Sequence, residues 1–201
     1  MNPLVSVVLP FFNAGDTLGR AIKSIAEQSF EDFQCILINN NSTDESSAIA
    51  DTWCQKDPRF ILLDEIKQGV THAFNCGLKA GSSQLIARMD ADDFAYADRI
   101  RLQVNFLRKN SDFDAVAGRV DIAEREDNEG FQRYIRWSNS VKNCEDINLQ
   151  RFVEMPVVNP SMMWRRSSVR KFGSYRIGNF PEDYEKWLRW LDMGAKIGKT
   201  S

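Results

Sequence analysis

Strand and helix patterns alternate over residues 1–120. Val5 to Leu9 is a β-branched apolar run that stops at Pro10, and it predicts a buried strand. The next segment repeats apolar residues with the period of a helix, which we expect to open near Asp16. The same pattern predicts further strands over 33–38, 60–63, 85–89 and 115–120, separated by helices from Ser42 onward, over 70–80 and over 98–109.

Short signals predict the ends of the middle helices. Ser42 and Glu45 have the S-x-x-E spacing of a capping box, so the second helix is expected to begin at Ser42 and to turn Ile49 and Trp53 inward. The third helix is expected to end at Gly81. Its expected buried face consists of Val70, Ala73, Phe74 and Leu78.

The alternation predicts an α/β fold. Strands that are connected by helices form a mostly parallel central sheet with helices on both faces. In such sheets ligands bind beyond the carboxyl ends of the strands. Polar clusters follow the strands at such ends, and they are expected to converge in space: Phe11-Phe12-Asn13, Asn39-Asn40-Asn41 and Asp90 to Asp93.

The second half of the chain is less regular. Residues 124–140 are polar and charged without a clean period, so we expect a mobile loop or an irregular hairpin. A strand is predicted over 161–165, and a helix over 182–193 that buries Tyr184, Trp187, Leu188 and Leu191. We interpret residues 1–201 as one domain that stops abruptly after a helix-then-strand pattern, and we expect it to be cut from a longer chain.

Composition excludes several classes of protein. The 201 residues carry 26 basic and 28 acidic side chains. This balance does not indicate a basic surface for binding nucleic acid or a polybasic patch for binding a membrane. The four cysteines include no C-x-x-C pair and there is one histidine, so we expect reduced thiols in a cytoplasmic protein and no zinc site. No stretch approaches the roughly 18 apolar residues of a membrane span.

The strongest chemical signal is Asp90-Ala91-Asp92-Asp93, directly after a predicted buried strand. Three carboxylates within four residues repel one another, and Mg²⁺ or Mn²⁺ is a natural counter-ion because hard cations take oxygen ligands. An acidic turn or a helix start is the competing interpretation. The position at a strand end favours a binding site.

Two further signals are weaker. Glu182 and Asp183 open the last predicted helix, where the helix dipole alone stabilises a carboxylate, although such a group could also serve as a general base. The amides of Asn39, Asn40 and Asn41 could hydrogen-bond the edge of a base, or could form Asx-turns.

Together, these segments resemble the family-2 glycosyltransferases of the GT-A fold, the fold of nucleotide-diphospho-sugar transferases. The resemblance rests on motifs in family order along nearly the whole chain: V-S-V-V-L-P-F-F-N-A (Val5 to Ala14), S-I-A-E-Q-S-F-E-D-F-Q (Ser24 to Gln34), S-T-D (Ser42 to Asp44), N-C-G-L-K-A-G (Asn75 to Gly81), D-A-D-D (Asp90 to Asp93), N-P-S-M-M-W-R-R (Asn159 to Arg166) and E-D-Y-E-K-W-L-R (Glu182 to Arg189).

The resemblance implies an inverting transfer of a sugar from a nucleotide-diphosphate donor, a UDP- or dTDP-sugar, to a hydroxyl of a glycan or lipid-linked acceptor. It implies a role in the synthesis of cell-surface polysaccharide. The protein would then be cytoplasmic, with peripheral association at the inner face of the membrane as a further expectation. Residues 1–118 would bind the donor and 119–201 the acceptor. Asp183 would be the catalytic base with Glu182 beside it, and Asp90 and Asp92 would bind Mn²⁺ or Mg²⁺, with Asp92 the more direct ligand. The expected donor-binding residues are Pro10, Phe11, Asn13, Asn39, Asn40, Asp44, Asn75, Asp90 and Ala91.

Two departures from the family pattern leave other functions open. Family members usually have acidic residues where Asn39 and Asn40 stand, and often a histidine near Asn159. A catalytically idle nucleotide-sugar-binding module is therefore a rival interpretation. A sugar-nucleotide nucleotidyltransferase is another rival, although such an enzyme would be expected to open with a glycine-rich basic loop. A dinucleotide dehydrogenase is disfavoured, because the first predicted strand is not followed by a G-x-G-x-x-G motif.

Overall fold

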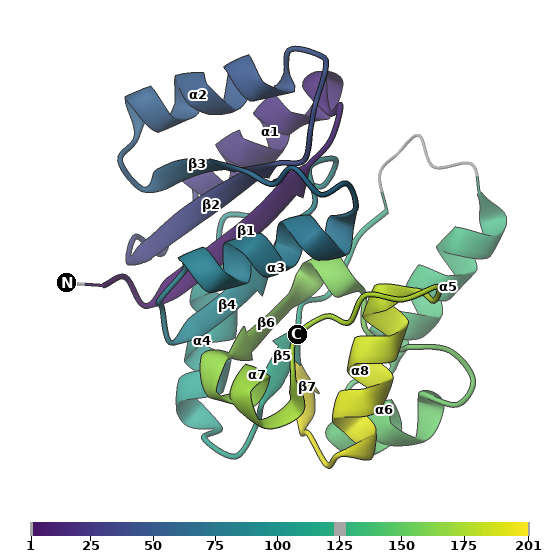
Figure 1. Cartoon of the computed structure of the whole chain (residues 1–201). Coiled ribbons are helices and arrows are strands. Elements are labelled where there is room, and N and C mark those ends of the chain that lie inside the picture. Colours follow the sequence, from purple (N-terminus) through teal and green to yellow (C-terminus); the bar gives the residue numbers. More distant parts are fainter. Residues whose placement is uncertain (1, 123–127, 201) are drawn as a thin grey trace.

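A computed structural model describes residues 2–122 and 128–200, and in this part of the chain seven strands form one sheet in the order β3-β2-β1-β4-β6-β5-β7 (Figure 1). β1, β2, β3 and β4 are parallel, and β6 runs antiparallel to both β4 and β5. The strands are β1 (Val5–Phe11), β2 (Phe33–Asn39), β3 (Phe60–Asp64), β4 (Leu85–Arg88), β5 (Ala115–Ala117), β6 (Met162–Arg165) and β7 (Ile197–Lys199).

Helices cover both faces of the sheet, as the alternating pattern predicts. They are α1 (Gly15–Ala26), α2 (Ser46–Lys56), α3 (Val70–Ala80), α4 (Arg99–Lys109), α5 (Glu129–Ser140), α6 (Cys144–Gln150), α7 (Arg166–Phe172) and α8 (Glu182–Asp192). Successive residues of a strand point to opposite faces, so Val7 and Leu9 pack with α1 and α4 while Val8 packs with α3. No helix of the described residues is long and apolar enough to cross a membrane.

Helix α3 lies unusually close to the sheet because of Gly77. A Cβ atom at this position would stand 2.6 Å from a side-chain carbon of Val8 and 2.7 Å from one of Ile38. Only a residue without a side chain allows the helix to pack against β1 and β2 at this distance. The close packing holds the start of α3 next to the loop that follows β3.

The first half of the chain confirms the predicted order of strands and helices, with one error at a helix start. α2 begins at Ser46, and its N-cap residue, Glu45, makes no side-chain cap hydrogen bond, so the helix start and capping box expected at Ser42 were wrong. Asp44 accepts the hydrogen bond of the Ser46 amide at 3.0 Å and ends the loop instead. Val70 was also misplaced, since its side chain is 40% exposed.

The second half differs more from the sequence-based expectations. Residues 129–140 form α5, whose start is capped by the Asn128 side chain, so the predicted loop or hairpin was wrong there. Residues 124–127 of that prediction lie outside the described residues. The helices α6 and α7 were not predicted. α8 confirms the predicted helix, and the four cysteines are free thiols as expected.

α8 buries one of its own lysines in the hydrophobic core. Lys186 is 0% exposed, and its Nζ lies 3.4 Å from the ring centroid of Trp164 and 3.8 Å from that of Trp187. Tyr175 and Trp190 complete this aromatic cage. The Nζ atom has no hydrogen-bond partner in the described structure. Burial, together with the positive charges of two arginines, lowers the pKa of Lys186 well below its ordinary value.

We predict that Lys186→Met stabilises the protein at pH 7 by about 1–3 kcal/mol, because desolvation of a buried ammonium outweighs its attraction to the rings. The pKa of Lys186 is lower in the folded state, so the unfolded chain binds more protons below about pH 10.5. Wild-type stability should therefore rise towards that of the variant as the pH increases. Urea unfolding of both proteins at pH 7 and pH 10 measures the two free energies of unfolding. If their difference is as large at pH 10 as at pH 7, the prediction is contradicted.

Candidate functional site

The loops at the carboxyl ends of β1 and β2 are joined by hydrogen bonds. The Asn13 amide donates to Ser42 Oγ at 3.1 Å, and the Thr43 amide donates to Asn13 Oδ1 at 2.8 Å. Asn13 and Asn41 are the non-glycine residues with positive φ in the described chain, at 46° and 64°. Asparagine tolerates this left-handed conformation, which lets both chains turn sharply where the strands end.

Asp44 fastens the starts of two helices together. Its carboxylate accepts from the amides of Gly15, at the start of α1, and of Ser46, at the start of α2. The hydrogen bonds, chiefly that with Ser46, lower the pKa of Asp44. Asp44 thus shapes the loops that were expected to bind a donor; whether it also contacts a ligand stays a prediction.

The asparagine triplet after β2 binds the loop after β3. Asn40 is 3% exposed, donates to the carbonyls of Glu65 and Lys67, and accepts from the Gly69 amide at 2.7 Å. Asn39 donates to Asp64 Oδ1 at 2.9 Å and accepts from the Ser42 amide at 3.0 Å. Both side-chain amides therefore hold the loop together, as expected if the motif shapes a turn rather than binding a base.

The acidic turn after β4 holds its carboxylates in different surroundings. Asp90 pairs with Arg88, whose Nε lies 2.8 Å from Asp90 Oδ1. Asp92 is exposed, and Arg20 donates to its backbone carbonyl rather than to its carboxylate. Burial, followed by the charges of Asp90 and Asp92, raises the pKa of Asp93 to about 6.

These carboxylates do not form a complete metal site by themselves. Among the described residues no group of three or more histidine, cysteine or acidic side chains is placed to hold a metal ion. Asp90 is occupied by Arg88, whereas the Asp92 carboxylate makes no hydrogen bond or ion pair with another described residue. A cation here would take Asp92 as ligand and complete its shell with ligand oxygens and water, which suits Mg²⁺ or Mn²⁺.

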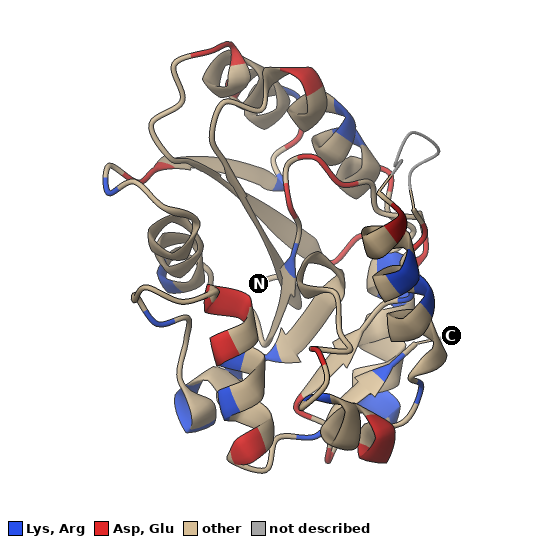
Figure 2. Cartoon of the chain, turned by 90° about the vertical axis from the view of Figure 1, so that its right-hand side faces the viewer, with Lys and Arg blue, Asp and Glu red and all other residues tan. Residues whose placement is uncertain are grey.

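The second acidic pair opens α8, as predicted. Glu182 and Asp183 are half-buried in its first turn, and Figure 2 shows the acidic upper end of this helix. The Tyr184 amide donates to Asp183 Oδ1 at 2.8 Å. Burial, followed by the charges of Glu154 and Asp183, raises the pKa of Tyr134 of α5 to about 12.

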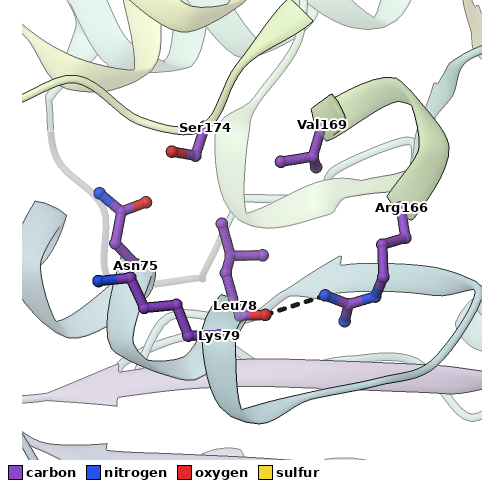
Figure 3. Close-up of a pocket in the computed structure, with 6 residues that line it drawn as sticks. All are labelled: Asn75, Leu78, Lys79, Arg166, Val169 and Ser174. Atoms are coloured by element: carbon purple, nitrogen blue, oxygen red, sulfur yellow. Dashed lines mark hydrogen bonds between the residues drawn. The ribbon is translucent and has the colours of Figure 1, made fainter. Parts of the chain in front are cut away.

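Three of the expected donor-binding residues lie in unexpected places. Pro10 and Phe11 are buried, Phe11 in the core under α1. Asn75 donates to the Tyr175 carbonyl at 2.9 Å and faces a cavity of about 340 Å³ between α3 and α7 (Figure 3). Ala91 stays within the acidic turn. Direct contacts of these residues with a donor remain predictions.

Sequence reasoning missed the buried polar residues behind the site. Arg88 and Tyr175 lie between the acidic turn and α8, and Arg99 donates to the carbonyls of Arg88 and Pro160. The arginine two residues before the acidic turn was a signal that could have been used, since a buried carboxylate needs a cationic partner.

We predict that Asn40→Ala lowers the free energy of unfolding by about 1–3 kcal/mol, because it removes the buried amide that joins the two loops and leaves the partly buried Gly69 amide without its acceptor. Asn41→Gly is the matched control. It removes an exposed amide from the same loop and keeps a residue that tolerates positive φ. Denaturant unfolding measures both. An Asn40→Ala protein that keeps its stability but binds nucleotide weakly would favour a base contact over the loop role.

Known proteins resemble this chain in sequence. Residues 6–173 match the model of the family described as "Glycosyl transferase family 2". An uncharacterized glycosyltransferase of Haemophilus influenzae is 30% identical over 200 residues, which cover 96% of this chain and 62% of that protein. The amylovoran biosynthesis glycosyltransferase AmsE of Erwinia amylovora is 25% identical, over 96% of this chain and 72% of AmsE. The chain thus spans less than two thirds of the first of these relatives.

Solved structures share its fold. S. aureus TarS in complex with UDP matches with a TM-score of 0.80 at 16% identity, covering 100% of this chain and 58% of TarS. The mannosyltransferase PcManGT from Pyrobaculum calidifontis, in complex with GDP-Man and Mn²⁺, matches with a TM-score of 0.74 at 18% identity, covering 99% of this chain and 55% of PcManGT.

Proposed function

Because this chain belongs to glycosyl transferase family 2 and has the GT-A fold, we propose that it transfers a sugar from a nucleotide-diphosphate donor to an acceptor hydroxyl. One observation carries the proposal. The acidic turn follows β4 at the ligand-binding edge of the sheet, and its Asp92 carboxylate is exposed and makes no hydrogen bond or ion pair with another described residue.

We assign donor binding to residues 1–118 and acceptor binding to residues 119–201. A uracil or thymine base is our proposal for the donor, supported by the UDP complex of TarS. The GDP-Man complex of PcManGT shows that this fold also accepts a guanine nucleotide. The acceptor we propose is a glycan or a lipid-linked glycan of a cell-surface polysaccharide, in keeping with the naming of AmsE for amylovoran biosynthesis.

We assign Asp92 to a divalent cation, with Asp90 held beside it by Arg88. When bound, Mn²⁺ or Mg²⁺ supplies positive charge that offsets the charge developing on the leaving diphosphate. The Mn²⁺ in the PcManGT complex supports this choice. The protein's own part is to orient the carboxylates: Arg88 fixes Asp90, and the Arg20 contact with the Asp92 carbonyl fixes the turn.

Asp183 is our choice for the general base. It accepts the proton of the acceptor hydroxyl as that oxygen attacks the anomeric carbon from the face opposite the diphosphate, so one displacement inverts the configuration. An idle binding module or a nucleotidyltransferase would not depend on Asp183, and the tests below separate these functions.

We predict that Asp92→Ala weakens the binding of UDP in the presence of Mn²⁺ by about tenfold or more, since it removes the proposed protein ligand of the cation. Isothermal titration calorimetry with and without Mn²⁺ measures the effect. Asp51→Ala, which removes an exposed acid from α2, is the control and should bind as the wild type does. Equal, metal-independent affinity in Asp92→Ala would refute the metal role.

We predict that Asp183→Asn lowers the rate of sugar transfer by about 10²–10⁴-fold and leaves nucleotide affinity nearly unchanged, because it keeps the shape of the side chain and removes the proton acceptor. Turnover with a working donor and acceptor, and UDP affinity, are measured on both proteins. Full transfer by the variant would place the base elsewhere. Loss of nucleotide binding together with turnover would indicate a structural role.

A further inference from the structure

Buried polar side chains connect the acidic turn to α8, and they begin at Arg88. Its side chain is 4% exposed, and its guanidinium contacts both oxygens of Asp90, Nε at 2.8 Å and Nη2 at 3.4 Å. The opposite side of the guanidinium faces aromatic rings. Its Cζ lies 5.2 Å from the ring centroid of Phe74 and 5.6 Å from that of Tyr175. The position of Asp90 therefore depends on where these rings hold Arg88.

The ring of Tyr175 is in turn held by Asn159. The Tyr175 hydroxyl donates to Asn159 Oδ1 at 2.9 Å, and Trp187 Nε1 of α8 donates to the same oxygen at 2.9 Å. Asn159 is 6% exposed. Because an indole nitrogen can only donate, the amide has one possible orientation, with its oxygen towards Trp187. A single buried oxygen thus fixes Tyr175 on one side and α8 on the other.

We propose that Asn159 is a positioning residue that sets the geometry of Asp90 and of Asp183 together. The inference rests on the proposed function, since it concerns how the two ends of that site are aligned. Trp187 stands one helical turn after Asp183, so a shift of its indole moves the first turn of α8. A shift of the Tyr175 ring moves Arg88, and with it Asp90. Among the described residues, the hydrogen bonds of Asn159 go to Tyr175 and Trp187 and not to either acidic residue.

The Tyr175 ring is packed between two side chains, so a shift of the ring is passed on to Arg88. Lys186 Nζ lies 4.3 Å from the centroid of this ring, and Arg88 Cζ lies 5.6 Å from it. Without the hydrogen bond to Asn159 the ring is free to tilt, and the packing of Arg88 against it changes. A packed core responds to such a loss by rearranging rather than by leaving the ring in place.

The test is Asn159→Leu, which keeps the volume of the side chain and removes the oxygen. We expect the affinity for UDP in the presence of Mn²⁺ to fall about fivefold or more in this variant. The rate of sugar transfer should fall about tenfold or more beyond that, because the reacting groups are misplaced. Asn159→Asp keeps an acceptor for both donors and should restore most of the affinity and the rate.

Ser168→Ala is the control for a purely structural effect. Ser168 is buried and donates to Asp114 at 2.8 Å, so this variant also loses a buried hydrogen bond, away from the site. Affinity and transfer are measured well below the melting temperatures of both variants. If Asn159→Leu does not fold, Tyr175→Phe, which removes one hydroxyl and keeps the ring, is measured instead and should show the same two losses.

The outcomes separate this inference from the function on which it rests. A wild-type chain that binds neither UDP nor GDP in Mn²⁺ refutes the proposed function and this inference with it. The positioning role alone is refuted if the wild-type chain binds nucleotide and Asn159→Leu binds UDP and transfers sugar as well as Ser168→Ala does. Loss of both affinity and rate, with recovery in Asn159→Asp, supports it.

Discussion

The parallel pairing of β1 with β2 on one side and β4 on the other determines where the candidate site lies. The register pairs Phe11 with Asn39 at the ends of β1 and β2, and Val8 with Arg88 at the end of β4. Three loops therefore leave the sheet at one edge. The side chains of Asn13, Asn40 and Asp44 accept backbone hydrogen bonds that hold the loops after β1, β2 and β3 against one another.

Charge is distributed unevenly over this edge. Asp90 is neutralised by a buried arginine, Asp92 is free, and the pKa of Asp93 is raised by burial and by its acidic neighbours. On the other side, α8 supplies Glu182 and Asp183, and its own Trp187 and Trp190 pack against Trp164 and Phe172. A cation and an anionic donor suit the first region, and a hydroxyl that must lose a proton suits the second. The proposed transfer uses both.

The first half of the fold could be predicted from the sequence because each strand and helix there has its own apolar period and ends at a proline, glycine or polar cluster. α5 could not be predicted in this way. Its charged residues Arg133 and Arg136 alternate with apolar ones, and its start depends on a cap from Asn128. The start of α2 was misjudged because Asp44, within the expected capping box, binds Ser46 itself.

The candidate site was predictable in part. A cluster of acids after a strand is visible in the sequence, and so is an acidic helix start. The partner of Asp90, Arg88, stands only two residues away, but its burial depends on distant residues such as Phe74 and Tyr175. Lys186 shows the limit most plainly, because lysine is a surface residue by type and only the cage around it reveals that it is buried.

The location of Mn²⁺ in crystals of the chain grown with UDP tests the account most directly. The anomalous signal of the metal identifies its position independently of the nucleotide. The account predicts one strong peak beside the Asp92 carboxylate, with the nucleobase of UDP against the loops after β1 and β2. A nucleotide bound elsewhere, such as in the cavity between α3 and α7, or a metal that does not contact Asp92, would contradict it.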